Sequence, residues 1–138
     1  MNRTTRVEDL MTTAVISLHE DEPITRAQLE MRLADIHHLP VVDGRARVLG
    51  IISSRNLIGL RANDKALRAS DVMTRGVKTI HASQPAHVAA GLMLHHRIGA
   101  LPVVGDDECL VGILTETDFL MVAQQALGGP AIASARAF

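Results

Sequence analysis

Near the end of the chain, a threonine and an aspartate follow a glycine in the order Gly112, Thr115 and Asp118. They join the end of an apolar stretch to the start of a predicted helix, whose free amides and dipole favour an anion. The Thr115 hydroxyl can contact a phosphate, and the Asp118 carboxylate can accept hydrogen bonds from two adjacent ribose hydroxyls. Gly112 would let a flat ring approach the strand closely. Together these residues favour the binding of a nucleotide.

The same spacing also has a structural interpretation. Thr-x-x-Asp is the pattern of a capping box, in which both side chains satisfy backbone groups at the start of a helix. Aspartate is shorter than the usual glutamate partner, and the segment recurs earlier in the chain, from Gly50 through Ser53 to Asn56. The recurrence favours a binding site, and the two roles can coexist at Thr115.

The recurrence covers most of the chain. Residues 7–60 and 69–122 align at an offset of 62 positions without a gap, with 15 identities in 54 positions. Such repetition indicates units that cannot bury their apolar faces alone, and two copies favour a closed pair over a solenoid. We predict a first unit over residues 1–62, a linker over 63–68, a second unit over 69–127, and a C-terminal tail over 128–138 that is mobile or contacts another chain.

Each copy has the pattern of a strand, a helix, two strands and a second helix. Acidic residues before Pro23 predict a helix start, and β-branched runs around Asp43-Gly44 predict a hairpin. The predicted elements are a strand near 15–18, a helix from Pro23 to about Asp35, strands at 39–42 and 48–52, and a helix from Ser53 to about Leu60, with second-copy helices from Pro85 to about His96 and from Thr115 to Leu127.

Composition limits the function classes. The 138 residues suffice for two half-sized lobes that share a core, and because Phe119 and Phe138 are the only aromatic residues, that core must be aliphatic. The net charge is −1, and Lys and Arg form no basic stripe, which argues against nucleic acid as the main partner. No apolar run is long enough to cross a bilayer and the N-terminus lacks a signal core, so we expect a cytoplasmic protein.

No cofactor, metal centre or catalytic site is predicted. Cys109 is the only cysteine, which excludes an intrachain disulfide and a cysteine-based metal site. Adjacent histidines on a helix point about 100° apart, so neither His37-His38 nor His95-His96 easily shares one ion. No nucleophile with its base is identifiable, and the chain is therefore not expected to be an enzyme.

The doubled order of motifs resembles a known family. Each copy has a Met-Thr lead, a Leu-Pro-Val-Val strand, and a Gly-h-h-Thr/Ser-x-x-Asp/Asn ending, where h is apolar. This is similar to a cystathionine β-synthase (CBS) domain pair, or Bateman module, over residues 7–122, with no catalytic domain attached. The resemblance implies an α/β (α+β) fold: two β-α-β-β-α motifs packed through their sheets with pseudo-twofold symmetry.

The resemblance also implies a function. Clefts between the two motifs would bind AMP, ADP, ATP or S-adenosylmethionine, and the module would stack into a homodimer that senses energy or metabolite state. Asp118 would be the ribose acceptor and Thr115 the phosphate contact of the second cleft. The implied binding residues are Val15, Ser17, His37, His38, Leu39, Pro40, Ser53 and Asn56 in the first cleft, and Val77, Thr79, Ala100, Leu101, Pro102, Gly112, Thr115 and Asp118 in the second.

Two departures from the family pattern leave alternatives open. Asn56 stands where Asp118 stands, so the first cleft is expected to be weaker or empty, because its ribose contact lacks a charge. His37 and His38 lie where the family often carries a basic pair facing phosphates, although a helix C-terminus favours histidine in any case. Gly99 and Ala100 replace them in the second copy. A structural dimerisation scaffold with vestigial clefts is therefore the alternative function.

Overall fold

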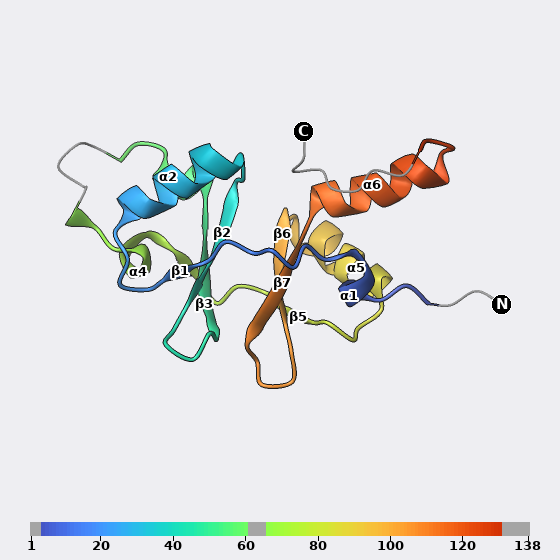
Figure 1. Cartoon of the computed structure of the whole chain (residues 1–138), viewed down its shortest axis with the longest axis horizontal. Helices are drawn as coiled ribbons and strands as arrows, with labels where there is room; N and C mark the ends of the chain where they lie inside the picture. The colour runs from blue at the N-terminus through green and yellow to red at the C-terminus, as the bar shows by residue number, and fades with distance from the viewer. Residues whose placement is uncertain (1–3, 61–65, 131–138) are drawn as a thin grey trace. The chain divides into compact units, whose positions relative to one another are not determined.

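Figure 1 shows the computed structural model, which describes residues 4–60 and 66–130. The chain divides into two compact units. Unit A contains residues 16–78 with 108–110, and unit B contains the rest of the described chain, including residues 4–15. Residues 63–65 of the predicted linker and residues 131–138 of the predicted tail lie outside the described residues.

Unit A is built on a four-stranded mixed sheet in the order β1-β2-β3-β4. β1 is parallel to β2, whereas β3 is antiparallel to both of its neighbours. Its elements are β1 (Leu18–His19), α2 (Ile24–Ala34), β2 (His38–Val42), β3 (Val48–Ser53), α3 (Ser54–Leu57), α4 (Ala69–Val72) and β4 (Thr74–Arg75).

Unit B repeats this plan with a three-stranded sheet in the order β5-β6-β7. Its elements are α1 (Val7–Leu10), β5 (Ile80–His81), α5 (Ala86–His96), β6 (Ala100–Val104), β7 (Leu110–Thr115) and α6 (Glu116–Ala126). Figure 1 shows α1 beside α5, and α6 continuing from the end of β7. The predicted mixed α/β class and the order β-α-β-β-α in each copy are confirmed.

The first residues of each repeat, 7–12 and 69–74, are called the leads. Each lead packs in the unit that holds most of the other repeat, so the two leads are exchanged between the units. Thr74, from the lead of the second repeat, pairs with Ile51 through the β4–β3 ladder of unit A. Thr12, from the lead of the first repeat, forms the matching bridge to Ile113 in unit B, where the two backbone N–H···O distances are 2.9 and 3.0 Å. The leads therefore extend both sheets by one short antiparallel segment.

The two hydrophobic cores show the same exchange. The core of unit A is made of Leu18, Ala27, Ile36, Leu39, Val41, Ile52, Ala69 and Met73, of which the last two precede β4. The core of unit B is made of Val7, Ile80, Ala89, Met93, Leu101, Val103 and Leu114, of which Val7 comes from α1. Fully burying one such aliphatic side chain is worth roughly 1.5–3 kcal/mol, so the leads are part of each unit's stability.

The hairpin between β2 and β3 is closed by Asp43, as the Asp43-Gly44 signal predicted. Its Oδ1 accepts hydrogen bonds from the backbone N–H groups of Arg47 at 3.0 Å and Arg45 at 2.8 Å. These donors, first that of Arg47 and then that of Arg45, lower the pKa of the Asp43 carboxyl. The turn is therefore fixed by the charged form of the side chain.

The predicted helix from Ser53 to about Leu60 is wrong in length, because α3 ends at Leu57. Ile58 has an extended backbone with ψ 131°, and Gly59 adopts φ +85°. The α3 helix buries none of its residues, and Ile58 is 78% exposed. A helix without an apolar face to bury gains little from packing, and the left-handed glycine ends it. The aligned helix of the second repeat, α6 (Glu116–Ala126), agrees closely with the predicted helix from Thr115 to Leu127.

The exchanged leads leave little space for a side chain at the two aligned glycines, Gly50 and Gly112. A Cβ at Gly50 would lie 2.5 Å from the Thr74 carbonyl oxygen and 2.9 Å from Met73 Sδ. A Cβ at Gly112 would lie 2.5 Å from Met11 Sδ and 3.1 Å from the Thr12 carbonyl oxygen. A methionine side chain can move aside more easily than a backbone carbonyl, so the two positions differ in tolerance.

We expect Gly50→Ala to destabilise the protein by about 1–3 kcal/mol, the range for overpacking, and Gly112→Ala to destabilise it less. Gly91, within α5, has nothing within 4 Å of an added Cβ. Gly91→Ala should therefore be neutral or stabilise by up to about 1 kcal/mol through helix propensity. Urea denaturation of the three variants measures this order, and equal effects at Gly50 and Gly91 would contradict it.

Candidate functional site

We call residues 112–118 the second junction, because they join β7 to α6 in unit B. Asp118 Oδ2 accepts hydrogen bonds from the Thr115 backbone N–H at 2.9 Å and from Thr115 Oγ1 at 3.3 Å. Its other oxygen, Oδ1, accepts a hydrogen bond from Thr12 Oγ1 at 3.3 Å. The capping interpretation of Thr115-x-x-Asp118 is therefore confirmed, and the carboxylate also holds a side chain from the exchanged lead.

The start of α6 offers fewer free amides to an anion than the sequence suggested. Besides the Thr115 N–H, which bonds to Asp118, the Glu116 N–H donates to the Gly99 carbonyl oxygen at 3.2 Å. Two donors at this helix start are thus satisfied within the chain. The Thr115 hydroxyl also donates to Asp118 Oδ2 at 3.3 Å, so a phosphate at this position would have to compete with that bond.

We call residues 50–56 the first junction, which joins β3 to α3 in unit A. Asn56 Oδ1 accepts hydrogen bonds from the Ser53 backbone N–H at 2.7 Å and from Ser53 Oγ at 2.9 Å. Asn56 Nδ2 lies 3.4 Å from Thr74 Oγ1, to which it donates. The Ser54 N–H donates to the His37 carbonyl oxygen at 3.0 Å, as Glu116 does to Gly99. The two junctions therefore share one hydrogen-bond plan.

In the structure, the aligned glycines of the two repeats, Gly50 and Gly112, permit close packing of the chain on itself. The close approach that Gly112 permits is made by Met11 and Thr12, and that at Gly50 by Met73 and Thr74. The prediction that Gly112 leaves room for a flat ligand ring does not match this arrangement. Gly112 is buried, and the space above its Cα is occupied by the exchanged lead.

The other predicted ligand residues fall into two groups. Leu39, Pro40, Leu101 and Pro102 have fully buried side chains, and Ala100 is buried as well, so these positions could offer a ligand mainly backbone atoms. Ser17, His38 and Thr79 are partly buried, whereas His37 is exposed. The strand registers Leu18↔Val41 and Ile80↔Val103 bring Ser17 next to Pro40 and Thr79 next to Pro102.

Val15 and Val77 are assigned to different units from the rest of their predicted sets. Val15 belongs to unit B although its set lies in unit A, and Val77 belongs to unit A although its set lies in unit B. Both side chains are partly buried. Their contribution to a binding site therefore remains a prediction from the family resemblance.

Sequence reasoning missed the threonines that reach the two junctions, Thr12 and Thr74. They form an identical pair in the repeat alignment, so a signal was present. A lead segment is adjacent in sequence to its own repeat, however, and nothing in a single sequence indicates that it packs on the other one. The exchange became visible only in the strand pairing.

A serine, a histidine and an aspartate also lie together in unit B, outside the junctions. His81 Nδ1 is 2.8 Å from Ser83 Oγ, and His81 Nε2 is 2.9 Å from Asp106 Oδ1. His81 Nδ1 also accepts the Ser83 backbone N–H at 3.1 Å, just as His19 Nδ1 accepts the Asp21 N–H at 3.3 Å in the first repeat. The first repeat has Asp21 in place of the serine, and His19 still holds its turn in the same way. The contacts of His81 are therefore interpreted as fixing the turn.

The rest of the described chain adds two observations. Within residues 4–60 and 66–130, no three His, Cys, Asp or Glu side chains are grouped closely enough to hold a metal ion. No helix in these residues is both long enough and apolar enough to span a bilayer.

Comparison with known proteins identifies the family. The CBS domain family matches residues 7–63 and 69–124. The chain belongs to the CBS domain family. The predicted resemblance is thereby confirmed, and both junctions lie inside the matched CBS domains.

Solved CBS domain structures resemble the chain along most of its length. The CBS domain pair of protein MJ0100, in complex with 5′-methylthioadenosine and S-adenosyl-L-methionine, is 31% identical with a TM-score of 0.80, over 90% of this chain and 99% of that one. The structure of CBSX2 in complex with AMP is 26% identical with a TM-score of 0.80, over 89% of this chain and 98% of that one.

Among curated sequences, a homoserine O-acetyltransferase of Methanocorpusculum labreanum is 41% identical over 109 residues. That alignment covers 79% of this chain but only 22% of the relative. The chain thus spans about a fifth of the length of this curated relative. The enzyme name describes a much longer protein and does not transfer to the CBS domains.

The geometry of the second junction generates a stability prediction. Asp118→Ala removes the acceptor for the Thr115 N–H and should destabilise the protein by about 0.5–2 kcal/mol, the range for lost helix caps. Asp118→Asn should cost little, because Asn56 caps the first junction with the same atoms. Thr117→Ala, an exposed position in the same turn, is the matched control. Urea denaturation decides, and equal losses for Asp118→Ala and Asp118→Asn would count against capping by the side-chain oxygen.

Proposed function

We propose that this protein is a non-catalytic regulatory module that binds adenosine-containing ligands at its two strand–helix junctions. Family membership and the adenosine compounds bound by related CBS domain pairs support this proposal. The observation that carries it is the carboxylate of Asp118, held in place by Thr115 beside the hydroxyl of Thr12. A fixed carboxylate is the group that recognises the two adjacent hydroxyls of a ribose.

The hydrogen bonds at Asp118 leave capacity for a ligand. An ionised carboxylate has about four acceptor positions, and three donors from the chain occupy part of them. The bond from Thr12 Oγ1, at 3.3 Å, is longer than the 2.9 Å bond that caps the helix. A ribose hydroxyl could therefore join or replace Thr12 at Oδ1 without uncapping α6.

The proposed regulatory role depends on ligand binding that favours one arrangement of the protein over another. A ligand changes the behaviour of a protein only if it binds one arrangement more tightly than another. We propose that ligand occupancy at the junctions shifts the packing of the exchanged leads, in a cytoplasmic homodimer of stacked modules. The target of this regulation would be a protein partner whose activity follows the energy or metabolite state.

The alternative is a structural dimerisation scaffold without a ligand. Asn56 in place of an acid, and the absence of a basic pair at Gly99 and Ala100, favour this alternative. Thermal unfolding with a panel of adenosine compounds distinguishes the two functions, because a ligand at 100 times its Kd should stabilise the folded state by about 2.7 kcal/mol. The absence of any shift would favour the scaffold.

For the binding residues we expect Asp118→Ala to lose most of the affinity for AMP, ATP or S-adenosylmethionine at the second junction, and Asn56→Ala to have a smaller effect. The reason is that charge-assisted hydrogen bonds are roughly twice as strong as neutral ones. Isothermal titration of each ligand measures the affinities.

The control for this titration is Asp71→Ala, which removes a similar cap: Asp71 Oδ2 accepts the Arg68 N–H at 2.8 Å at the start of α4 in unit A. It should leave binding at the second junction unchanged. If Asp71→Ala reduced affinity as much as Asp118→Ala, loss of stability rather than loss of ribose contact would explain both results.

A further inference from the structure

The two oxygens of Asp118 are occupied to different extents. Oδ2 accepts two hydrogen bonds from Thr115, one from its backbone N–H at 2.9 Å and one from its hydroxyl at 3.3 Å. Oδ1 accepts one bond, from the Thr12 hydroxyl at 3.3 Å. A carboxylate oxygen offers about two acceptor positions, so the cap fills Oδ2 and about one position remains on Oδ1.

A ribose brings one donor more than this oxygen can accept. Its two adjacent hydroxyls need both positions of Oδ1, of which Thr12 already holds one. Thr12 and Asp118 are both only partly buried, so a ligand can approach their contact. The bond from the Thr115 hydroxyl is equally long, but it lies on the oxygen that holds the cap. The bond from Thr12 is therefore the one that a ribose can replace without disturbing the start of α6.

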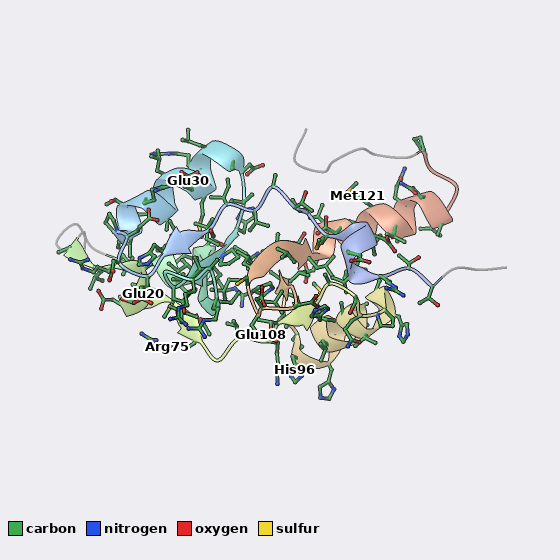
Figure 2. All side chains as sticks on the ribbon, turned by 60° about the horizontal axis from the view of Figure 1, so that its bottom comes forward. Glu20, Glu30, Arg75, His96, Glu108 and Met121 are labelled. Carbon is green, nitrogen blue, oxygen red and sulfur yellow. The ribbon has the colours of Figure 1, made fainter. Side chains whose placement is uncertain are left out.

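The lead that carries Thr12 is attached to its sheet by a shorter stretch of pairing than the lead of the second repeat. Thr12 joins Ile113 through an isolated bridge, whereas β4 pairs with β3 at two successive residues. Arg75 on β4, labelled in Figure 2, also donates from its side chain to the Ser70 carbonyl oxygen at 3.2 Å. Thr13, the residue aligned with Arg75, has no guanidinium group to brace its lead in this way. The bond to Asp118 is therefore a larger part of what holds Thr12 in place.

The beginning of the same lead is anchored independently of Asp118. Val7 is fully buried, and its backbone N–H donates to the Gln84 carbonyl oxygen at 2.9 Å. The Glu8 N–H donates to the Ala82 carbonyl oxygen at 3.0 Å. Release of Thr12 would therefore leave α1 in place and affect the residues that follow it, through which the chain continues into unit A at residue 16.

The first junction has no equivalent competition. Asn56 Nδ2 donates to Thr74 Oγ1, so the threonine hydroxyl is the acceptor there. Asn56 Oδ1 already accepts two hydrogen bonds from Ser53. Thr74 therefore occupies no acceptor position that a ribose hydroxyl would use, and a response based on displacement is confined to the second junction.

From these observations we infer that Thr12 is a positioning residue that responds to occupancy of the second junction. Its hydroxyl holds Asp118 Oδ1 while the junction is empty, and the ribose hydroxyls of an adenosine compound displace it. The displacement loosens the bridge to Ile113 and leaves the cap of α6 intact. By linkage, a contact that the ligand must break weakens the binding of that ligand by the same factor. This inference rests on the proposed function and adds how the lead responds to the ligand.

The test removes the Thr12 hydroxyl in the full chain. Thr12→Val keeps a β-branched side chain and the backbone bridge but has no hydroxyl hydrogen to donate, whereas Thr12→Ser keeps the hydroxyl. Thr13→Val makes the same substitution at the next residue, which is exposed, and is the matched control. Far-UV circular dichroism and thermal melting verify folding. Isothermal titration with AMP and with 2′,3′-dideoxy-AMP then follows the binding step that Asp118→Ala removes.

We expect Thr12→Val to bind AMP about threefold to tenfold more tightly, because the ribose no longer has to displace a hydrogen bond. Thr12→Ser and Thr13→Val should both stay within about twofold of the unmodified protein. The dideoxy compound lacks both ribose hydroxyls and does not compete for Oδ1. Its affinity should therefore change by less than about twofold in Thr12→Val, which a general effect on stability would not explain.

Amide hydrogen exchange measures the response of the lead itself. AMP should speed exchange at the Thr12 and Ile113 amides, which form the bridge, and leave the Val7 and Glu8 amides unchanged. In Thr12→Val the side chain no longer holds Asp118, so AMP should no longer speed exchange at the bridge.

The outcomes separate this inference from the proposed function. If AMP does not bind the unmodified protein, or if Asp118→Ala removes no binding step, the proposed function fails at the second junction and this inference fails with it. If the step is present, three results overturn only the displacement of Thr12: AMP affinity that is unchanged or weaker in Thr12→Val, an equal gain for the dideoxy compound, or exchange at the bridge that AMP does not alter.

Discussion

The exchange of the Met-Thr leads is the constraint on which the rest of the structure depends. Each sheet is extended by a short antiparallel segment that precedes the other repeat: Thr74 pairs with Ile51, and Thr12 with Ile113. The methionine before each threonine lies over a glycine of the receiving strand, where a Cβ would leave too little room. Because Met73 and Val7 are also core residues, neither unit has a complete core without residues from both repeats.

The exchanged leads also contribute residues to the candidate sites. The threonine that completes each sheet is the one that contacts the capping residue of the following helix, as Thr12 contacts Asp118 and Thr74 contacts Asn56. Capping and ligand recognition are therefore compatible functions of one side chain. One oxygen of Asp118 fixes the helix start, and the other faces a hydroxyl that a ligand could supplement. Any movement of a lead would change the polar groups at its junction.

The sequence predicted the repeated elements well because they depend on local signals. Pro23 and Pro85 precede α2 and α5, and the Asp43 turn lies between two β-branched runs. The overlong prediction for α3 had a local cause too, since Gly59 at φ +85° ends a helix that buries nothing. The lead exchange could not be predicted, because pairing of Thr12 with Ile113 joins residues about a hundred positions apart and depends on tertiary packing. For the same reason, the sequence analysis attributed the glycine at position 112 to the approach of a ligand, whereas in the structure Met11 packs against it.

The two junctions share the same backbone hydrogen bonds, so their side chains can differ while the backbone geometry is kept. The bonds from Ser54 to His37 and from Glu116 to Gly99 use only backbone atoms, so they persist whatever the side chains are. Ser53 and Thr115, paired with Asn56 and Asp118, cap their helices through equivalent atoms although one acceptor is neutral and the other is charged. Folding therefore requires an acceptor at this position but not a charge. Since capping does not determine the charge, folding alone does not account for the contrast between Asn56 and Asp118 at the two junctions.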